Sequence, residues 1–530
     1  MDHRNEQGDG PPHRADATRR RADLPTARER EREREPERAR ERAAFRRGFV
    51  ATLALGGAAC LAALAVGGAG TPVTTPPRVE VLAPGAVPPV LAPAAARVPA
   101  PAAPAAPLKR PAPVLDQDFA DPDVVRVGRV YHAYATNAHG RNIQHATSTD
   151  LVRWTVDATD VLPEVGAWVT LDPPGHVWAP EVFDNGDGFT LHYTARDRAG
   201  GRQCIGVALA DSPGGPFRPA GDGPLVCPTE QGGAIDASSH TEDGVRHLLW
   251  KSDGNCCGLD TWIHLQPVSW DGTRVTGAPV RLIKQDDPHN WEQGLVEAPT
   301  LVKRDGRHVL LFSGGDYRTN GYAAGWATSD ALTGPYVKGD GPFMTTESFA
   351  GAIGGPGGQD VVTGPGGQDR ILFHGRGADG SRRVLYAADL GFADGGRPVV
   401  RGSRTAYEAE LARVHLASVR AARDAWGGRA VGHIDEPGSF VEFRVFAASP
   451  GRHTMSVRYG NGSLDASDAP TAASHGLTVN GTAAGAVDYP YTGWDEWRST
   501  EVPVDLREGW NTLRLTKGER YAELDAVEVA

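Results

Sequence analysis

A pattern of about 60 residues recurs five times between residues 115 and 400, and it limits the folds that this chain can adopt. Each copy has an acidic or small-residue turn, a short apolar run, a Gly turn and an aromatic-rich strand, as in ADPDVVRVGRVYHAYAT. The turn glycines are Gly128, Gly188, Gly244, Gly306 and Gly367. Short strands without a helical stripe are typical of propeller blades rather than of a helical solenoid. The repeat therefore predicts an all-β chain with a five-bladed β-propeller.

A propeller directs equivalent positions of all its blades at one central channel. Each repeat carries an acid near its start: Asp121, Glu181, Asp236, Glu297 and Asp360. We therefore expect these five acids at the same position of successive blades, gathered around a shared funnel although they are far apart in sequence.

The remaining composition indicates several modules. The chain has 530 residues, more than one core normally uses, and its formal net charge of −11 disfavours a nucleic-acid partner. Residues 1–48 are rich in Arg and Glu and offer almost nothing to bury, so we expect them to be disordered or to form a solvated charged helix. We expect the protein to act as a monomer.

Residues 49–68 are apolar or small and directly follow the Arg46-Arg47 pair and one Gly. They are either the apolar part of a cleaved secretory signal, with a twin-arginine character, or a retained membrane anchor. In both cases the rest of the chain lies outside the cytoplasm, either secreted or tethered to the cell surface. Residues 69–113 are mainly Pro, Ala and Val, which predicts a semi-rigid extended linker.

Four cysteines lie beyond the apolar segment: Cys204, Cys227, Cys256 and Cys257. In an exported chain an even number indicates disulfides. Adjacent cysteines rarely bond to each other, so we expect Cys256 and Cys257 to pair with Cys204 and Cys227. A zinc site is the alternative, but the vicinal pair has no CxxC or HxxxH companion.

Four phrases at the starts of the repeats carry a specific resemblance. They are FADPD, WAPEV, AIDAS and VEAPT, and together with IQHATSTDLVRW and ATSDALTGPY they resemble the diagnostic stretches of family 43 glycoside hydrolases. The resemblance covers residues 114–402. It implies a five-bladed propeller that cleaves arabinofuranosyl or xylosyl linkages with inversion and needs no cofactor for catalysis.

Matched residue by residue, the resemblance makes Asp121 the general base, Glu297 the general acid and Asp236 the carboxylate that orients the acid and adjusts its pKa. The chemistry asks for such a set, because inversion needs one carboxylate to activate water and one carboxylic acid to protonate the leaving oxygen, roughly 6.5–9.5 Å apart. A buried acid beside another carboxylate keeps its proton at neutral pH. Taken singly, an Asp before Pro or an acid at a strand end is commonly structural; three such acids in matching phrases favour catalysis.

Other residues of the propeller are candidates for substrate contact. Trp178 could stack on a sugar or fill the gap between blades. Glu181 is structural or lies next to the substrate, and Gln359 and Asp360 match a family stretch that lines the channel. His374 falls where many members place a histidine near an axial calcium ion, although a core histidine held by a backbone hydrogen bond explains it equally well.

Residues 405–530 predict a β-sandwich, from alternating strands such as VEFRVFAAS and HTMSVRYGNG. The segment resembles carbohydrate-binding modules of family 35 or family 6, which are jelly rolls. The resemblance implies a structural calcium ion held by Glu408, Glu410 and Asp525, for which oxygen ligands are suited; the alternative is a pair of surface acids and a strand-end Asp. It places sugar-binding groups at Asn461, Tyr491, Trp494 and Trp497, although some of these aromatics could be core residues.

Two classes of function follow. The first is an exported inverting hydrolase of plant cell-wall polysaccharide, an α-L-arabinofuranosidase or β-xylosidase, with an endo-arabinanase or a galactan-directed enzyme as the alternative. The second is a non-catalytic surface protein in which both domains bind sugar. The intact set of three acids favours the enzyme.

Overall fold

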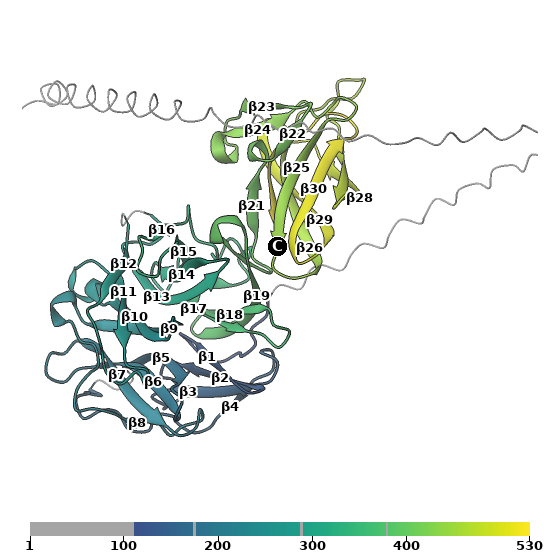
Figure 1. Cartoon of the computed structure of the whole chain (residues 1–530). Helices are drawn as coiled ribbons and strands as arrows, with labels where there is room; N and C mark the ends of the chain where they lie inside the picture. Colours follow the sequence, from purple (N-terminus) through teal and green to yellow (C-terminus); the bar gives the residue numbers. More distant parts are fainter. Residues whose placement is uncertain (1–110, 173–175, 287–289, 378–379) are drawn as a thin grey trace, which may run out of the picture. The chain divides into compact units, whose positions relative to one another are not determined.

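The computed structural model describes residues 111–172, 176–286, 290–377 and 380–530. The predictions for residues 1–48 and 49–68, and for all but the end of 69–113, lie outside these ranges. Within them the regular structure is nearly all β-strand, as predicted (Figure 1). No helix in the described ranges is long and apolar enough to cross a membrane.

The propeller consists of five four-stranded antiparallel sheets, each formed by strands consecutive in sequence (Figure 1). The blades are β1 (Asp123–Val127), β2 (Val130–Ala135), β3 (Gln144–Ser148) and β4 (Thr155–Val156); β5 (Val177–Asp184), β6 (Phe189–Arg196), β7 (Gln203–Ala210) and β8 (Arg218–Pro219); β9 (Ala234–Glu242), β10 (Val245–Ser252), β11 (Trp262–Val268) and β12 (Val280–Lys284); β13 (Val296–Arg304), β14 (Arg307–Gly314), β15 (Ala323–Ser329) and β16 (Val337–Lys338); and β17 (Gly354–Thr363), β18 (Asp369–Arg376), β19 (Arg383–Phe392) and β20 (Pro398–Val400). Every turn glycine of the sequence pattern lies between the first two strands of a blade. The five-bladed propeller is thus confirmed.

The hairpin turns follow from local chemistry. In the third and fourth blades the turn is Asp-Gly, and both residues have positive φ: 51° at Asp243 and 76° at Gly244, 51° at Asp305 and 78° at Gly306. Such a pair of left-handed residues is what a two-residue hairpin between right-twisted strands requires.

Apolar cores lie between the blades. Five clusters of buried side chains each join neighbouring blades, and the cluster with Val124 and Tyr131 of the first blade also contains Leu372 and Leu385 of the fifth. Leu115, ahead of the first blade, forms a β-bridge with Leu385. The ring is therefore closed by apolar packing between its first and last blades.

One backbone feature repeats in all five innermost strands. A residue with positive φ precedes or interrupts each of them: Asp121 (50°), Ala179 (42°), Asp236 (56°), Ala298 (49°) and Gly358 (56°). In the second, third, fourth and fifth blades the strand pairing shifts register around this residue, as at a β-bulge. Left-handed backbone is costly for residues other than Gly and persists where the surroundings impose it.

This feature corrects the expectation that the five acids occupy one repeat position. Asp121 and Asp236 are the left-handed residues of their blades, Glu297 precedes its own by one position, and Glu181 and Asp360 follow theirs by two. The acids therefore fall at three positions of the repeat. The bulge sets the register of each innermost strand, and the amino-acid composition does not reveal where the bulge lies. The presence of one acid in each repeat therefore does not show that the acids occupy equivalent positions.

Carboxylates also link successive blades around the channel. Each accepts a hydrogen bond from a backbone N–H of the next blade: Asp360 from Val124 (2.9 Å), Asp123 from Val182 (2.9 Å), Glu181 from Ser239 (2.8 Å) and Asp236 from Ala298 (2.9 Å). Buried polar groups need such partners. Glu181 and Asp360 thus have a structural role in joining blades.

Residues 405–530 form a sandwich of two antiparallel sheets, as predicted (Figure 1). One sheet has the order β23-β24-β31-β26-β29, with β21 also paired to β31, and the other has the order β22-β25-β30-β27-β28. The strands are β21 (Thr405–Glu408), β22 (Arg413–His415), β23 (Ser418–Ala421), β24 (Arg429–Gly432), β25 (Phe440–Ala447), β26 (Gly451–Asn461), β27 (Ala473–Val479), β28 (Thr482–Tyr489), β29 (Gly493–Leu506), β30 (Gly509–Lys517) and β31 (Glu523–Val529). Inward-facing side chains of both sheets form one apolar core.

The described residues include five 3₁₀ turns: η1 (Thr229–Gln231), η2 (Gly254–Cys257), η3 (Asp394–Gly396), η4 (Ala409–Leu411) and η5 (Trp426–Gly428).

The expected disulfide pairing is wrong. Cys204 bonds to Cys227, and Cys256 bonds to its neighbour Cys257 within η2. The reason is the pairing of Ile205 with Val226, which holds Cys204 and Cys227 with their Cα atoms 4.7 Å apart.

Candidate active site

A cavity of about 750 Å³ lies where the five innermost strands carry their residues of positive φ, and all five of these residues line it. Asp121, Asp236 and Glu297, which come from the first, third and fourth blades, all line it. The fold therefore brings the three predicted carboxyls to one cavity. Trp178, Glu181, Gln359 and Asp360 line the same cavity.

Asp121 is held by hydrogen bonds as a carboxylate. Thr136 Oγ1 donates to one oxygen (2.6 Å) and Arg383 Nη1 to the other (2.9 Å). Burial by itself raises the pKa of Asp121, but the Arg383 guanidinium, with His374 and the Thr136 hydroxyl, outweighs burial and holds the pKa below its ordinary value of 3.8. Asp121 is thus ionised at neutral pH and can accept a proton.

His374 lies behind Asp121 rather than in the cavity lining. The backbone N–H of Asp121 donates to His374 Nδ1 (3.2 Å), and burial lowers the pKa of the imidazole to about 3. The neutral ring therefore carries its proton on Nε2, which has no partner among the described residues. Nδ1 also lies 3.3 Å from Asp121 Oδ1, so a cation at Nε2 would select the other tautomer, and the axial calcium ion stays a prediction.

Glu297 contacts one hydroxyl and one ammonium group. Tyr322 Oη donates to Oε1 (2.8 Å), and Lys251 Nζ lies 3.3 Å from Oε2. Lys251 is buried, and its ammonium also lies 3.3 Å from Asp253 Oδ1. Burial opposes the charge on Lys251, but Glu297, Asp253 and Asp236 outweigh it and raise the pKa of Lys251. A fixed positive charge therefore lies behind Glu297.

Asp236 is the carboxyl that holds a proton near neutral pH. Burial and the negative charge of Glu297 raise the pKa of Asp236 to about 7, against the opposing effect of Lys251. Its Oδ2 accepts the hydrogen bond from Ala298 N. The cavity is thus lined by an ionised Asp121 and by Asp236, which retains a proton up to about pH 7 because of burial and the charge of Glu297.

The sequence analysis missed four side chains that contact these carboxyls: Thr136, Lys251, Tyr322 and Arg383. Lys251 carried a signal, because it is the one charged residue in the apolar run LLWKS of β10. Arg383 stands beside another arginine in SRRVLYAAD, and nothing local distinguishes it. Its pairing with Asp121 spans the closure between the fifth and first blades.

The other predicted cavity residues have different environments. Trp178 is half-buried in the cavity wall, with its ring 5.4 Å from that of His176. Gln359 is buried, accepts from Ser313 Oγ (3.0 Å) and donates to Ala298 O (2.8 Å), so its amide joins blades. Burial and Glu181 raise the pKa of Asp360 to about 8, so it holds a proton in the neutral range.

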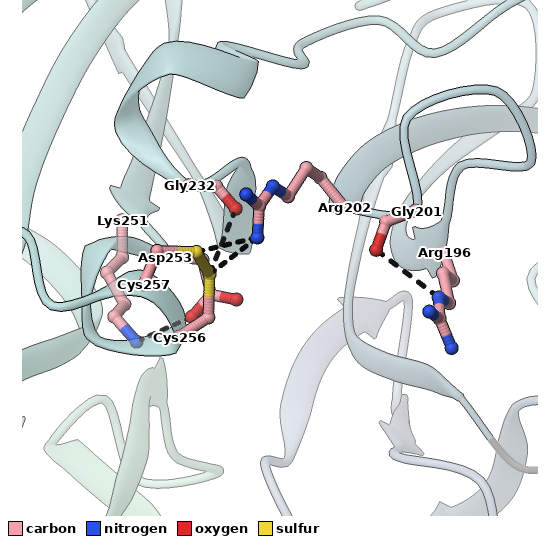
Figure 2. The surroundings of a disulfide bond; sticks show 8 residues. All are labelled: Arg196, Gly201, Arg202, Gly232, Lys251, Asp253, Cys256 and Cys257. Atoms are coloured by element: carbon pink, nitrogen blue, oxygen red, sulfur yellow. Dashed lines mark hydrogen bonds and ion pairs between the residues drawn. A yellow bond between two sulfur atoms is a disulfide. The ribbon is translucent and has the colours of Figure 1, made fainter. Parts of the chain in front are cut away.

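The vicinal disulfide lines this cavity through Cys256, and Figure 2 shows the residues around it. Cys256 and Asn255 line the cavity and are exposed, and Cys257 is half-buried. In Figure 2 the Arg202 guanidinium points at the two sulfur atoms, with Nη1 2.7 Å from Cys257 Sγ and 3.5 Å from Cys256 Sγ. Lys251 and Asp253 precede the disulfide in the same segment.

In the sandwich, Glu408, Glu410 and Asp525 gather at one place. Each has a buried carboxylate oxygen without a hydrogen-bond partner among the described residues. Burial, with the charges of Glu410 and Asp525, raises the pKa of Glu408 to about 7. Arg458 Nε donates to Asp525 (2.6 Å) and neutralises one of the three charges. Unpartnered buried oxygens are ligands of the kind that a hard divalent cation takes. These three acids are not among the described groups whose ligand atoms all lie within 4.8 Å of one another, so a cation would have to draw them closer together.

The predicted sugar-binding residues of the sandwich differ in their exposure to solvent. Tyr491 and Trp494 are exposed, by 39% and 48%, while Trp497 is half-buried with its Nε1 donating to Arg423 O (2.9 Å). Trp494 lines a second cavity together with Tyr521, which the sequence analysis missed. Asn461 is a correction: it is fully buried, and its amide binds Thr471 O, Tyr489 O and Ser463 N. The buried Asn461 amide is therefore not available to bind a sugar.

Comparisons with known proteins agree with this geometry. Residues 111–397, more than half of the chain, match the sequence profile "Glycosyl hydrolases family 43". The chain is 26% identical over 280 residues to a β-D-galactofuranosidase of Aspergillus niger, covering 50% of this chain and 76% of that protein. It is 25% identical over 256 residues to an extracellular endo-α-(1→5)-L-arabinanase of Thermotoga petrophila, covering 42% of this chain and 51% of that one.

Among solved structures, a thermostable family-43 glycoside hydrolase is 27% identical and matches with a TM-score of 0.49, covering 55% of this chain and 96% of its own. The profile match spans the five blades except strand β20, and it includes Asp121, Asp236 and Glu297 of the cavity. The chain therefore belongs to family 43 of the glycosyl hydrolases, enzymes that cleave O-glycosyl bonds with inversion.

Proposed function

We propose that the propeller removes α-L-arabinofuranosyl or β-xylosyl units from plant cell-wall polysaccharide. The observation that carries this proposal is one cavity lined by an ionised Asp121, by Asp236, which holds a proton near neutral pH, and by Glu297. The relatives support a sugar of this class, since one is named for a galactofuranoside and one for an α-(1→5)-linked arabinan.

In this proposal Asp121 is the general base. Its carboxylate, oriented by Thr136 and Arg383, takes a proton from water as the water attacks the anomeric carbon. Glu297 is the general acid and protonates the leaving oxygen on the other side of the sugar. Asp236 keeps the proton available, and Lys251 and Tyr322 fix the Glu297 carboxyl in place. No metal or cofactor is needed for these steps.

The proposal is tested by incubating the protein with 4-nitrophenyl arabinofuranoside, 4-nitrophenyl xyloside, arabinan and arabinoxylan, and following the released anomer by NMR. Release of a single pentose of inverted configuration is the expected result. An endo-arabinanase is the alternative, favoured by the relative of that name, and it would release oligosaccharides instead. Release of the retained anomer would contradict the assigned roles of the carboxyls.

Replacement of Asp236 by Asn is expected to change the pH profile. In the wild type, the alkaline limb of kcat/KM should lie near pH 7, where Asp236 loses its proton. The variant has only one of the two negative charges, so the limb should move down by about one pH unit, with a lower rate. The acid limb reports Asp121 and should stay below about pH 4. An unmoved alkaline limb in a folded variant would argue against the coupling.

We also propose that Glu408, Glu410 and Asp525 bind a structural calcium ion. Three unpartnered buried carboxylate oxygens support this proposal. Without a cation, the raised pKa of Glu408 means that the folded module loses stability as pH rises from about 4.5, the ordinary value, to about 7.

Addition of calcium should therefore raise Tm by several degrees, and by more at pH 8 than at pH 5. Differential scanning calorimetry with calcium or a chelator measures this shift. Glu408→Gln should remove most of it, whereas Glu496→Gln, at an exposed acid of the same domain, should not. Equal melting with calcium and chelator in the wild type would refute the site.

The sandwich is proposed to be a carbohydrate-binding module that holds the propeller near its substrate, which raises the local substrate concentration. The exposed rings of Trp494 and Tyr521 beside one cavity support this role, because aromatic faces stack on sugars.

We further propose that the enzyme acts outside the cell. Two disulfides in the described residues support an oxidising compartment, and the mass of the protein recovered from culture medium would distinguish secretion from anchoring through residues 49–68.

A further inference from the structure

We propose that the Cys256–Cys257 disulfide is a wall of the sugar-binding cleft, contacting the sugar unit on the leaving-group side of the cleaved bond. The inference rests on the proposed hydrolase function and names a substrate contact of the same site. Cys256 and Asn255 line the cavity that contains Asp236 and Glu297, and both are exposed.

The position of the disulfide on the leaving-group side of the cleft is inferred from the contacts of the segment that carries it. Lys251, at the end of β10, contacts both Glu297 and Asp253, and the disulfide comes three residues after Asp253. Asp121 is instead held from the fifth blade by Arg383. The disulfide therefore belongs to the Glu297 side, where the leaving oxygen and its sugar would lie.

The turn is rigid enough to serve as a wall. Gly232 packs directly on it, since a Cβ there would lie 2.4 Å from Asp253 O, and a Cβ on Gly254 would lie 2.1 Å from Asp260 O. Backbone hydrogen bonds join Asp253 N to Gly233 O (3.1 Å) and Leu259 N to Gly254 O (2.9 Å). The cross-link between adjacent residues further limits the conformations of this turn.

One flank of the disulfide is braced, and Cys256 also reaches the cavity. The Arg202 guanidinium contacts both sulfur atoms, and the Gly232 carbonyl oxygen lies 3.6 Å from Cys256 Sγ (Figure 2). A disulfide has no N–H or O–H donor, and its sulfur atoms are polarisable and weakly hydrated. It suits the C–H face of a sugar ring, while the adjacent Asn255 amide can bind a ring hydroxyl.

The test compares two substrates in a variant with Cys256→Ser and Cys257→Ser. One substrate is a pentose trisaccharide, and the other is the matching glycosyl fluoride, whose leaving group is a single atom. We expect KM for the trisaccharide to rise about fivefold, with kcat changed less than twofold, and both constants for the fluoride to stay the same. The matched control carries Cys204→Ser and Cys227→Ser, which removes the other disulfide, and should show no substrate-dependent change.

Other outcomes would overturn the inference. An equal loss on both substrates, with a shifted pH profile, would mean that the disulfide acts through Asp253 and Lys251 on Glu297 as a positioning element. An unchanged KM for the trisaccharide would mean that no sugar touches it. If the double variant does not fold, Asn255→Ala, at an exposed position of the same turn, should produce the same selective rise in KM, and its failure to do so would also overturn the inference.

Calorimetric titration with the trisaccharide separates this inference from the hydrolase proposal. Binding that the wild type shows and the disulfide variant weakens, without turnover in either, would refute the hydrolase function but keep the contact. Turnover with equal trisaccharide affinity in both proteins would do the reverse. Absence of both binding and turnover in the wild type would refute both.

Discussion

Asp121→Asn is expected to lower kcat by about 10²–10⁴-fold on every substrate, because the variant has no carboxylate to take a proton from the attacking water. The amide keeps the size of the carboxyl and can still accept the hydrogen bond from Arg383. The fold should therefore persist, which circular dichroism and Tm can verify. KM should change much less than kcat.

A matched control is Asp116→Asn, which alters an acid of the same segment whose side chain is 71% exposed. It should retain full activity. Azide offers a second check, since this small anion attacks without a base: it should restore turnover to Asp121→Asn and yield a glycosyl azide of inverted configuration. Normal kcat in a folded Asp121→Asn protein would exclude Asp121 as the base.

Glu297→Gln is expected to show a loss that depends on the leaving group. For an oligosaccharide, whose leaving oxygen needs a proton, kcat should fall by about 10²–10⁴-fold. For a 4-nitrophenyl glycoside the fall should be smaller, because nitrophenolate leaves without protonation. The ratio of the two losses is the measurement, and it distinguishes an acid from a residue that merely shapes the cavity.

Stability must be measured for this variant as well. Lys251 is buried, and Glu297→Gln removes one of its two carboxylate partners, leaving Asp253. Loss of a partner for a buried charge is destabilising, so Tm should fall although the fold persists. Glu164→Gln, at an exposed acid, is the control and should keep both activity and Tm. Equal losses on both substrates would remove Glu297 from the role of acid.

The repeat architecture was readable from the sequence because its signals are local. A Gly turn between two short strands depends on the φ that the turn requires, as at Gly244 and Gly306, and both neighbours lie within a few residues. The phrases around Asp121, Asp236 and Glu297 were equally local, and all three acids line one cavity. The alternation of the sandwich strands was visible for the same reason.

The structure differs from the sequence-based predictions wherever an outcome depends on register or on distant partners. The sequence predicts one repeat position for the five acids, but the left-handed residue of each blade places them at three. Asn461 has an amide side chain of the kind that binds sugars. It is nevertheless buried, and its amide forms hydrogen bonds within the sandwich. The disulfides followed strand pairing between Ile205 and Val226 rather than a rule about adjacent cysteines.

The sequence by itself determined the five-bladed ring, the sandwich and the presence of Asp121, Asp236 and Glu297 in the cavity lining, since turn sterics and strand periodicity act between near neighbours in the chain. Only the tertiary structure decided the protonation of Asp121 and Asp236. Arg383 reaches Asp121 across the closure of the ring, and Lys251 reaches Glu297 from the neighbouring blade. These charges act through short distances in a buried cavity, and such distances exist only once residues far apart in sequence have packed together.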